Sequence, residues 1–210
     1  AMIDNGATHT EIRLLADAYE ETSDNRFRDA AIKGITYLLT AQYDNGGWPQ
    51  RFPKPEGYAK HITFNDNAMI GVMSLMRDIL VDRKRFSFVQ KELNAQCEKA
   101  IERGIRCILK CQIKVNGRRT VWCAQHDEKT FQPRKARSYE LPSFSGNESV
   151  EVVRFLMQVD QPGKQVIEAI EGAVAWFEQS KLEGIKLVSI EDPTKPGGYD
   201  KIVVKDASGS

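Results

Sequence analysis

Carboxylate and amide side chains stand at the starts of three expected helices. Asp4 and Asn5 precede the first of these helices, Asp66 precedes the second and Glu148 opens the third. Each residue alone is explained as a helix cap, because such side chains satisfy free first-turn amides and complement the helix dipole. If the three helix starts lie together, their acids repel one another unless a cation separates them. Carboxylate and amide oxygens favour calcium as that cation.

The loops before the second and third helices carry aromatic, basic and hydrogen-bonding side chains. Sugar rings stack on aromatic faces and charged substituents pair with arginine forks, so this mixture favours an anionic sugar chain as the ligand. The candidates are Trp48, Arg51, Tyr58, Lys60, His61, Trp122, His126, Asp127, Lys135, Arg137, Tyr139 and Glu140. The structural alternatives are packing of Trp48 beneath its turn, a His126–Asp127 pair, an Arg137–Glu140 ion pair, a loop or core position for His61 and packing of Tyr139.

An internal repeat indicates how the chain positions these groups. Three segments share a glycine start, apolar residues at helical spacing and a glutamine end: GITYLLTAQ at 34–42, GIRCILKCQ at 104–112 and GAVAWFEQ at 172–179. A further helix is expected ahead of each segment. Three successive helix pairs would place the first helices side by side in a ring or partial ring, with their starts at one end. The predicted fold class is therefore all-α, with long loops between the helices.

Strand patterns are weak by comparison. Residues 113–123, 185–190 and 201–204 predict short edge strands or hairpins. Residues 191–198, with two prolines and two glycines, predict an irregular loop.

Composition excludes some classes of protein. The net charge of +1 on 210 residues gives no overall field for nucleic acid or an acidic membrane. No apolar stretch is long enough to span a membrane. The four cysteines lack the spacing of a zinc site, and buried free thiols are the favoured interpretation. A Cys107–Cys123 or Cys111–Cys123 bridge is the alternative if the protein is exported.

Five ordered motifs resemble a known family. IDNGAT, AQYDNGGWPQ, HITFNDNAM, WCAQHD and KARSYELPSFSGNES together are similar to the helical pectate lyases, polysaccharide lyase family ten. The resemblance runs through nearly the whole chain and implies an (α/α)3 toroid. It also implies a pectate lyase that performs calcium-assisted anti β-elimination on polygalacturonate or pectin oligosaccharides. From the charge and hydropathy above, neither nucleic acid nor a membrane is expected as a partner.

The resemblance implies roles for particular residues. Arg137 matches the arginine that accepts the C5 proton, Asp66 matches the main calcium-binding aspartate, and Asp4 matches a second acid that helps to hold calcium with substrate. An arginine base is chemically demanding, because the guanidinium pKa lies above about 12. Lys135 and the metal would have to help to lower it. The expected substrate-binding residues are Asn5, Lys135, His126, Asp127 and Trp48.

The resemblance also bears on domain organisation and location. We expect residues 1–210 to form one catalytic domain truncated at both ends, because family members continue past the position of residue 210 with a substrate-contacting segment. We expect a secreted or periplasmic protein, monomeric if the domain is complete. The rival functions are an inverting glycosidase, with acids drawn from Asp66, Asp127 and Glu140, and a non-catalytic pectin-binding fragment.

Overall fold

A computed structural model describes residues 1–206 of the chain. The chain divides into two compact units, with bounds Ala1–Val174 and Ala175–Ser210. The α-helices are α1 His9–Thr22, α2 Asn25–Ala41, α3 Ala68–Val81, α4 Lys91–Cys111, α5 Gly146–Leu156 and α6 Lys164–Ser180. The short 3-10 helices are η1 Gly57–Lys60 and η2 Asn65–Asn67. The strands are β1 Ile62–Thr63, β2 Lys114–Val115, β3 Arg118–Arg119, β4 Gln125–His126, β5 Ile185–Glu191 and β6 Tyr199–Lys205.

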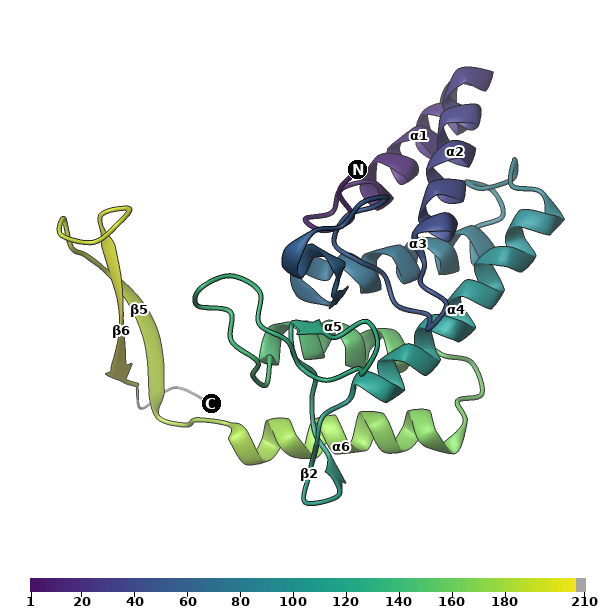
Figure 1. Cartoon of the computed structure of the whole chain (residues 1–210). Coiled ribbons are helices and arrows are strands. Elements are labelled where there is room, and N and C mark those ends of the chain that lie inside the picture. The colour runs from purple at the N-terminus through teal and green to yellow at the C-terminus, as the bar shows by residue number, and fades with distance from the viewer. Residues whose placement is uncertain (207–210) are drawn as a thin grey trace. The chain divides into compact units, whose positions relative to one another are not determined.

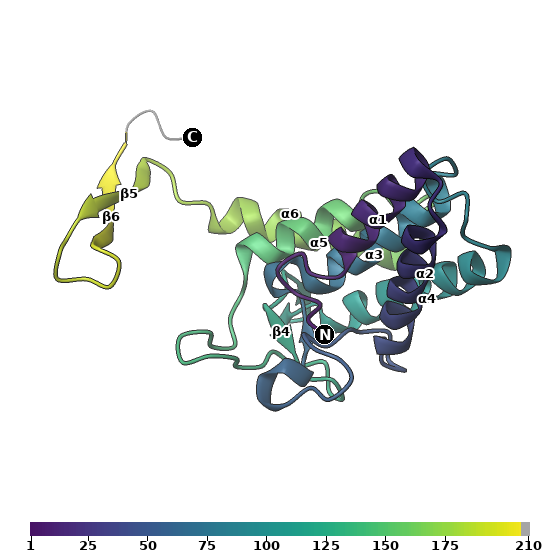
Figure 2. The same ribbon diagram turned by 90° about the horizontal axis from the view of Figure 1, so that it is seen from above.

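The first two of the three predicted helix pairs pack closely together. α1 lies along α2 and α3 lies along α4 (Figures 1 and 2). α3 is the inner helix, because nearly every residue from Ala68 to Met76 is buried, whereas α1, α2 and α4 bury one face. α5 also contacts α3 and packs less closely on α6 than the earlier partners do on each other. The prediction of an all-α fold is confirmed.

The glutamines that end two of the repeat segments lock neighbouring helices together. Gln42 donates from Nε2 to the carbonyl of Ala100 in α4 at 2.9 Å. Gln112 occupies the equivalent place and donates to the carbonyl of Ala169 in α6 at 2.8 Å. Each amide also donates to the loop that follows its own helix. The sequence repeat is therefore a repeat of tertiary contacts.

Two tryptophans repeat in the same way. Trp48 is completely buried and donates from Nε1 to the carbonyl of Leu38, while Trp122 is completely buried and donates to the carbonyl of Ile108, both at 2.8 Å. Each indole fastens a loop to the preceding helix. The predicted role of Trp48 in substrate binding is wrong for this structure, because an indole without exposed surface cannot stack on a sugar.

Short ladders tie the long loops to each other. β1 pairs antiparallel with β4, with Ile62 opposite His126 and Thr63 opposite Gln125. The amide of Ser145, just before α5, donates to the carbonyl of Trp122 at 2.8 Å. The starts of α3 and α5 are thereby held to one central loop. Strands as short as β1 carry no alternating pattern, so the sequence did not reveal them.

The second unit contains an antiparallel hairpin. β5 and β6 pair over seven residues each, from Ile185 opposite Lys205 to Glu191 opposite Tyr199. The expected strands at 185–190 and 201–204 are confirmed and extended. β2 and β3 confirm only a small part of the strand signal over residues 113–123.

The state of the cysteines and the absence of a membrane-spanning helix were also predicted from the sequence. Cys97, Cys107, Cys111 and Cys123 are free and buried, which confirms the favoured interpretation of the thiols. Among residues 1–206, no helix combines the length and the apolar character that crossing a membrane requires.

Candidate active site

Asp66 occupies a strained turn in front of α3. Asp66 and Asn67 have φ angles of 50° and 57°, a left-handed conformation that non-glycine residues adopt at a cost in free energy. The amides of Phe64 and Asn65 both donate to the carbonyl of Ala124, which holds the turn against the loop of β4. The strained turn leaves Asp66 exposed at the helix start.

Asp4 is buried beside the start of α1, with 3% of its surface exposed. Its Oδ2 accepts a hydrogen bond from Gln50 Nε2 at 2.5 Å. Its Oδ1 is buried and has no hydrogen-bond partner among residues 1–206. A buried, unpaired carboxylate oxygen costs free energy, so this atom is poised for a ligand. The adjacent Asn5 is exposed and has a φ of 55°.

Arg137 lies in the loop before α5 and is paired with Glu140. The guanidinium donates from Nε to Glu140 Oε2 at 3.0 Å and from Nη2 to Oε1 at 2.5 Å, and the Arg137 amide donates to Oε2 at 2.9 Å. The hydrogen bonds and charge of Glu140 raise the pKa of Arg137 above its usual value. The ion-pair alternative is confirmed, and the arginine is cationic in this arrangement.

The charges of the three helix starts meet at Asp66. Burial raises the pKa of Asp66, and the charges of Asp4, Glu148 and Glu140 raise it further, while Arg137 opposes them. These groups must therefore lie within electrostatic reach of one another. Glu148 is itself held by the hydroxyl of Ser145 just before α5. The structure thus brings together Asp4, Asp66 and Arg137, which lie far apart in the sequence.

This group of residues fits a hard divalent cation. The charges of Asp4, Glu140 and Glu148 all act on Asp66 and one guanidinium opposes them, so the acids repel unless positive charge is added. The unpaired Oδ1 of Asp4 offers a ready oxygen ligand. Asp4 and Asp66 are the residues of this chain that would hold such an ion.

His126 has a structural place instead. Its side chain is completely buried, its Nε2 accepts from the amide of Cys123 at 3.0 Å, and its Nδ1–H donates to the carbonyl of Phe131 at 2.8 Å. Burial lowers the pKa of His126 to about 4, so the ring is neutral at pH 7. Both ring nitrogens are occupied and no surface is exposed, which contradicts the predicted contact with substrate.

Asp127 is also saturated by its own loop. Oδ1 accepts from the amides of Lys129 at 2.9 Å and Thr130 at 2.8 Å, while Oδ2 accepts from Arg134. The Thr130 amide and these other donors lower the pKa of Asp127, against the effect of burial. With no oxygen free, Asp127 is a turn residue, and its predicted role in substrate binding is not supported. The expected His126–Asp127 pair is absent from the hydrogen bonds of the described loop.

His61 belongs to a second polar cluster. Ligand atoms of His61, Asp127 and Glu128 lie within 4.8 Å of one another. His61 Nδ1 contacts Glu128 Oε2 at 3.0 Å, and Lys60 lies 3.6 Å from the same carboxylate. Because Arg134 already neutralises Asp127, this cluster balances its own charge and has no need of a metal.

Lys135 and Tyr139 are exposed beside Arg137. Tyr139 exposes 99% of its surface, so the expectation that it packs is wrong. Lys135 is exposed as well, which is compatible with its predicted place near the substrate.

The whole chain matches a known family. Residues 1–210 match the family described as pectic acid lyase. The chain belongs to this family. Among solved structures, a family 10 polysaccharide lyase from Cellvibrio cellulosa is 36% identical, with a TM-score of 0.86. An aspartate-to-alanine mutant of a family 10 polysaccharide lyase from the same organism, in complex with trigalacturonic acid, is 35% identical, with the same TM-score. No curated protein sequence matches.

The likeness to the family 10 polysaccharide lyase structures is consistent with the predicted all-α toroid. Each comparison covers 100% of this chain and 64% of the solved chain. The chain therefore spans less than two thirds of those family members.

Sequence reasoning missed one residue of the site. Gln50 orients Asp4, although it lies 46 residues further along the chain. The only sequence signal was its place at the end of NGGWPQ, which the repeat explained as a loop feature.

Proposed function

We propose that this protein is a pectate lyase that cleaves polygalacturonate by calcium-assisted β-elimination. The observation that carries the proposal is the convergence of Asp4 and Asp66, with an unpaired buried oxygen, on a site that also holds the exposed Arg137. A family member bound to trigalacturonic acid supports this substrate class.

The reaction has three requirements at the sugar. The C5 proton must be removed, the negative charge that develops on the uronate must be stabilised, and the C4 oxygen must depart. Bound calcium would neutralise the uronate carboxylate and make the C5 proton more acidic. Asp4 and Asp66 would hold the ion, and the low exposure of Asp4 shields its carboxylate from water.

Arg137 is proposed as the acceptor of the C5 proton. The pair with Glu140 keeps the guanidinium charged, so this pair must open before Arg137 can act as a base. A uronate carboxylate is chemically able to compete for the same fork, because it resembles the carboxylate of Glu140. Once substrate has opened the pair, the guanidinium would have to release a proton to solvent before the neutral guanidine could accept the C5 proton.

Two exposed residues complete the proposed site. Asn5 precedes α1 and Lys135 lies two residues before Arg137, so both sit at the same loops as the acids and the base. We assign them to contacts with sugar hydroxyls and carboxylates. Because polymeric pectin is too large to cross a membrane, the proposed location is secreted or periplasmic.

The test is ultraviolet absorbance during incubation with polygalacturonate. β-Elimination leaves an unsaturated, absorbing sugar end, so absorbance should rise with calcium and stop rising after addition of a chelator. Arg137→Ala should abolish the rise, and Arg137→Lys should do the same, because a lysine lacks the fork. A calorimetric titration with calcium of the native chain and of Asp4→Asn provides a readout that needs no turnover.

Two other results would sink the proposal. New reducing ends without absorbance would indicate hydrolysis and favour the glycosidase. Binding of polygalacturonate with no product at any calcium concentration would favour a non-catalytic pectin-binding protein.

A further inference from the structure

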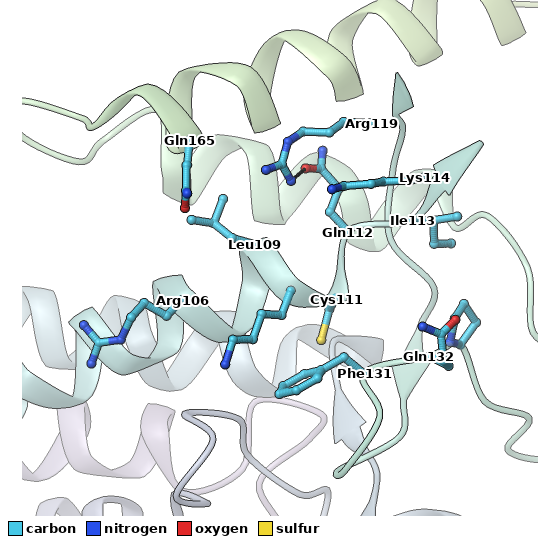
Figure 3. A pocket seen from close by; sticks show the side chains of 12 residues that line it. Arg106, Leu109, Cys111, Gln112, Ile113, Lys114, Arg119, Phe131, Gln132 and Gln165 are labelled. Carbon is cyan, nitrogen blue, oxygen red and sulfur yellow. Dashed lines mark hydrogen bonds between the residues drawn. The ribbon is translucent and has the colours of Figure 1, made fainter. Parts of the chain in front are cut away.

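A pocket of about 580 Å³ lies between the C-terminal end of α4, the β2–β3 hairpin and the start of α6 (Figure 3). All its lining residues belong to the first unit. None of the residues whose charges meet at Asp66 contributes to it. The pocket is therefore separate from the candidate active site.

Cations line this pocket, and acids do not. The charged lining residues are Arg106, Lys110, Lys114 and Arg119. Of the ion pairs formed within residues 1–206, one reaches the pocket, from Arg106 to Glu102 at 4.0 Å. A concave surface with charges of one sign concentrates their field, in a chain whose net charge is only +1.

Arg119, on one wall of the pocket, is fixed by one hydrogen bond and keeps most of its N–H donors available. Arg119 donates from Nη1 to Gln112 Oε1 at 3.0 Å, and Gln112 is itself fixed by its bonds to the backbone of Thr120 and Ala169. A guanidinium has five N–H donors, so most of the fork stays available. Figure 3 shows Arg119 and Gln165 on one side of the pocket, with Arg106 and Phe131 on the other.

Phe131 forms the opposite wall in a strained conformation. Its φ is 63°, which is unfavourable for a bulky residue. The amide of Phe131 donates to the carbonyl of Asp127, and its own carbonyl accepts from His126, so the buried loop enforces the strain. The ammonium of Lys110 lies 5.1 Å from the ring centroid. This cation–π contact places the charge of Lys110 at the pocket wall.

We propose that this pocket binds a carboxylated saccharide, in the form of a short stretch of uronate chain. The arginine fork and the lysines pair with carboxylates. Gln132 and Gln165 also line the pocket, and their side-chain amides make no hydrogen bond to residues 1–206. These amides suit sugar hydroxyls, which a simple inorganic anion lacks. The choice of a uronate among sugar acids rests on the proposed function, but binding requires no turnover.

The test is a titration of the isotope-labelled full chain with trigalacturonate, followed by NMR in calcium-free buffer with a chelator. The amide signals of Lys114, Arg119 and Phe131 should shift and saturate. The double variant Lys110→Glu/Lys114→Glu should raise the dissociation constant read at Arg119 at least about tenfold. The matched control Lys33→Glu/Lys99→Glu changes net charge equally at exposed lysines outside the pocket and should bind like the native chain.

Three outcomes would overturn the assignment. The first is the absence of saturable shifts at the pocket, and the second is an equal loss of affinity in both double variants. The third is an equal response to inorganic phosphate at the same ionic strength, which would show a general anion site. Because signals are assigned residue by residue, binding near Asp66 is recorded separately. Loss of the lyase reaction with an intact pocket response would remove only the proposed function.

Discussion

Two polar clusters of the first unit, the loop at residues 122–134 and the group around Asp66, differ in how far their hydrogen-bonding capacity is used. In the loop at residues 122–134, His126 and Asp127 have every strong acceptor or donor paired within the loop. Around Asp66, a carboxylate oxygen of Asp4 is unpaired and Arg137 is exposed. Buried polar groups are normally satisfied. Among the buried side-chain atoms of residues 1–206 that lack a partner, Asp4 Oδ1 is the one carboxylate oxygen, which sets it apart as a candidate ligand atom.

The difference has a physical cause in the backbone. The amides of Thr130 and neighbouring residues point inward at Asp127 and replace the water that the carboxylate loses on burial. At Asp4, the described part of the chain supplies a single side-chain donor, Gln50. The saturated loop behaves as a rigid support, while the acid cluster keeps a capacity to bind.

The largest expected effect is that of Asp66→Asn. Loss of one acid from the proposed calcium site should lower the rate of β-elimination about 10²–10³-fold. Stability at pH 7 should be unchanged or slightly higher, because neighbouring acids already disfavour the charged form of Asp66. Rates come from ultraviolet absorbance and stability from urea unfolding.

Asp127→Asn is the matched control in the saturated loop. It should lower the free energy of unfolding by about 2 kcal/mol, because a charged acceptor of several hydrogen bonds is weakened. The folded fraction should retain its activity. A fully folded but inactive Asp127→Asn protein would reverse the comparison.

His126→Ala should act on stability. Removing a completely buried ring with two hydrogen bonds should cost about 3 kcal/mol of unfolding free energy. Lys135→Ala, at an exposed position, should change the unfolding free energy by less than about 0.5 kcal/mol. Urea denaturation of both variants measures the difference, and equal midpoints would contradict the structural role of His126.

Stability should also fall in mild acid. His9 and His126 both have pKa values lowered to about 4, chiefly by burial, and Arg13 adds to the effect at His9. The unfolded chain binds protons at these rings from about pH 6.5 downward, whereas the folded chain does not until near pH 4. Each ring should therefore remove about 2 kcal/mol of stability between pH 7 and pH 5.

Urea unfolding at several pH values measures this loss. His9→Gln should flatten the dependence by about half, because one of the two rings is gone. A stability that stays constant from pH 7 to pH 5 would show that the two histidines are protonated in the folded chain as readily as in the unfolded chain.

Glu140→Gln should have a smaller effect, on the pH profile of activity. Glu140 raises the pKa of Arg137, so its neutral replacement should lower that pKa. If deprotonated Arg137 accepts the C5 proton, the rise of activity with pH should move to lower pH. A profile that keeps its position would indicate that Arg137 serves as a fixed cation.

The smallest effect is expected for Tyr139→Ser. With 99% of its surface exposed, Tyr139 contributes little packing, and the unfolding free energy should change by less than about 0.5 kcal/mol. Thermal unfolding of the variant beside the native chain is sufficient. A clear loss of stability would show that Tyr139 packs against the rest of the protein in solution, contrary to its exposed position in the structure.

The sequence by itself determined the paired helices and the places where they begin. Glycine starts, apolar spacing and the terminal glutamines repeat because each helix pair solves the same local packing problem. Asp4, Asp66 and Arg137 were identified by their motifs, since helix starts and loops are local features. The same spacing predicted a ring or partial ring of helix pairs, and the family resemblance implied the (α/α)3 toroid.

Only the tertiary structure decided which polar groups are free. Trp48 and His126 are residue types that often bind sugars. In this structure the Trp48 indole N–H donates to the carbonyl of Leu38, and the His126 Nδ1–H donates to the carbonyl of Phe131. The cationic pocket likewise forms where three separate segments meet. Hydrogen-bond saturation and burial depend on partners that fold against a residue from elsewhere in the chain, and residue type alone does not specify those partners.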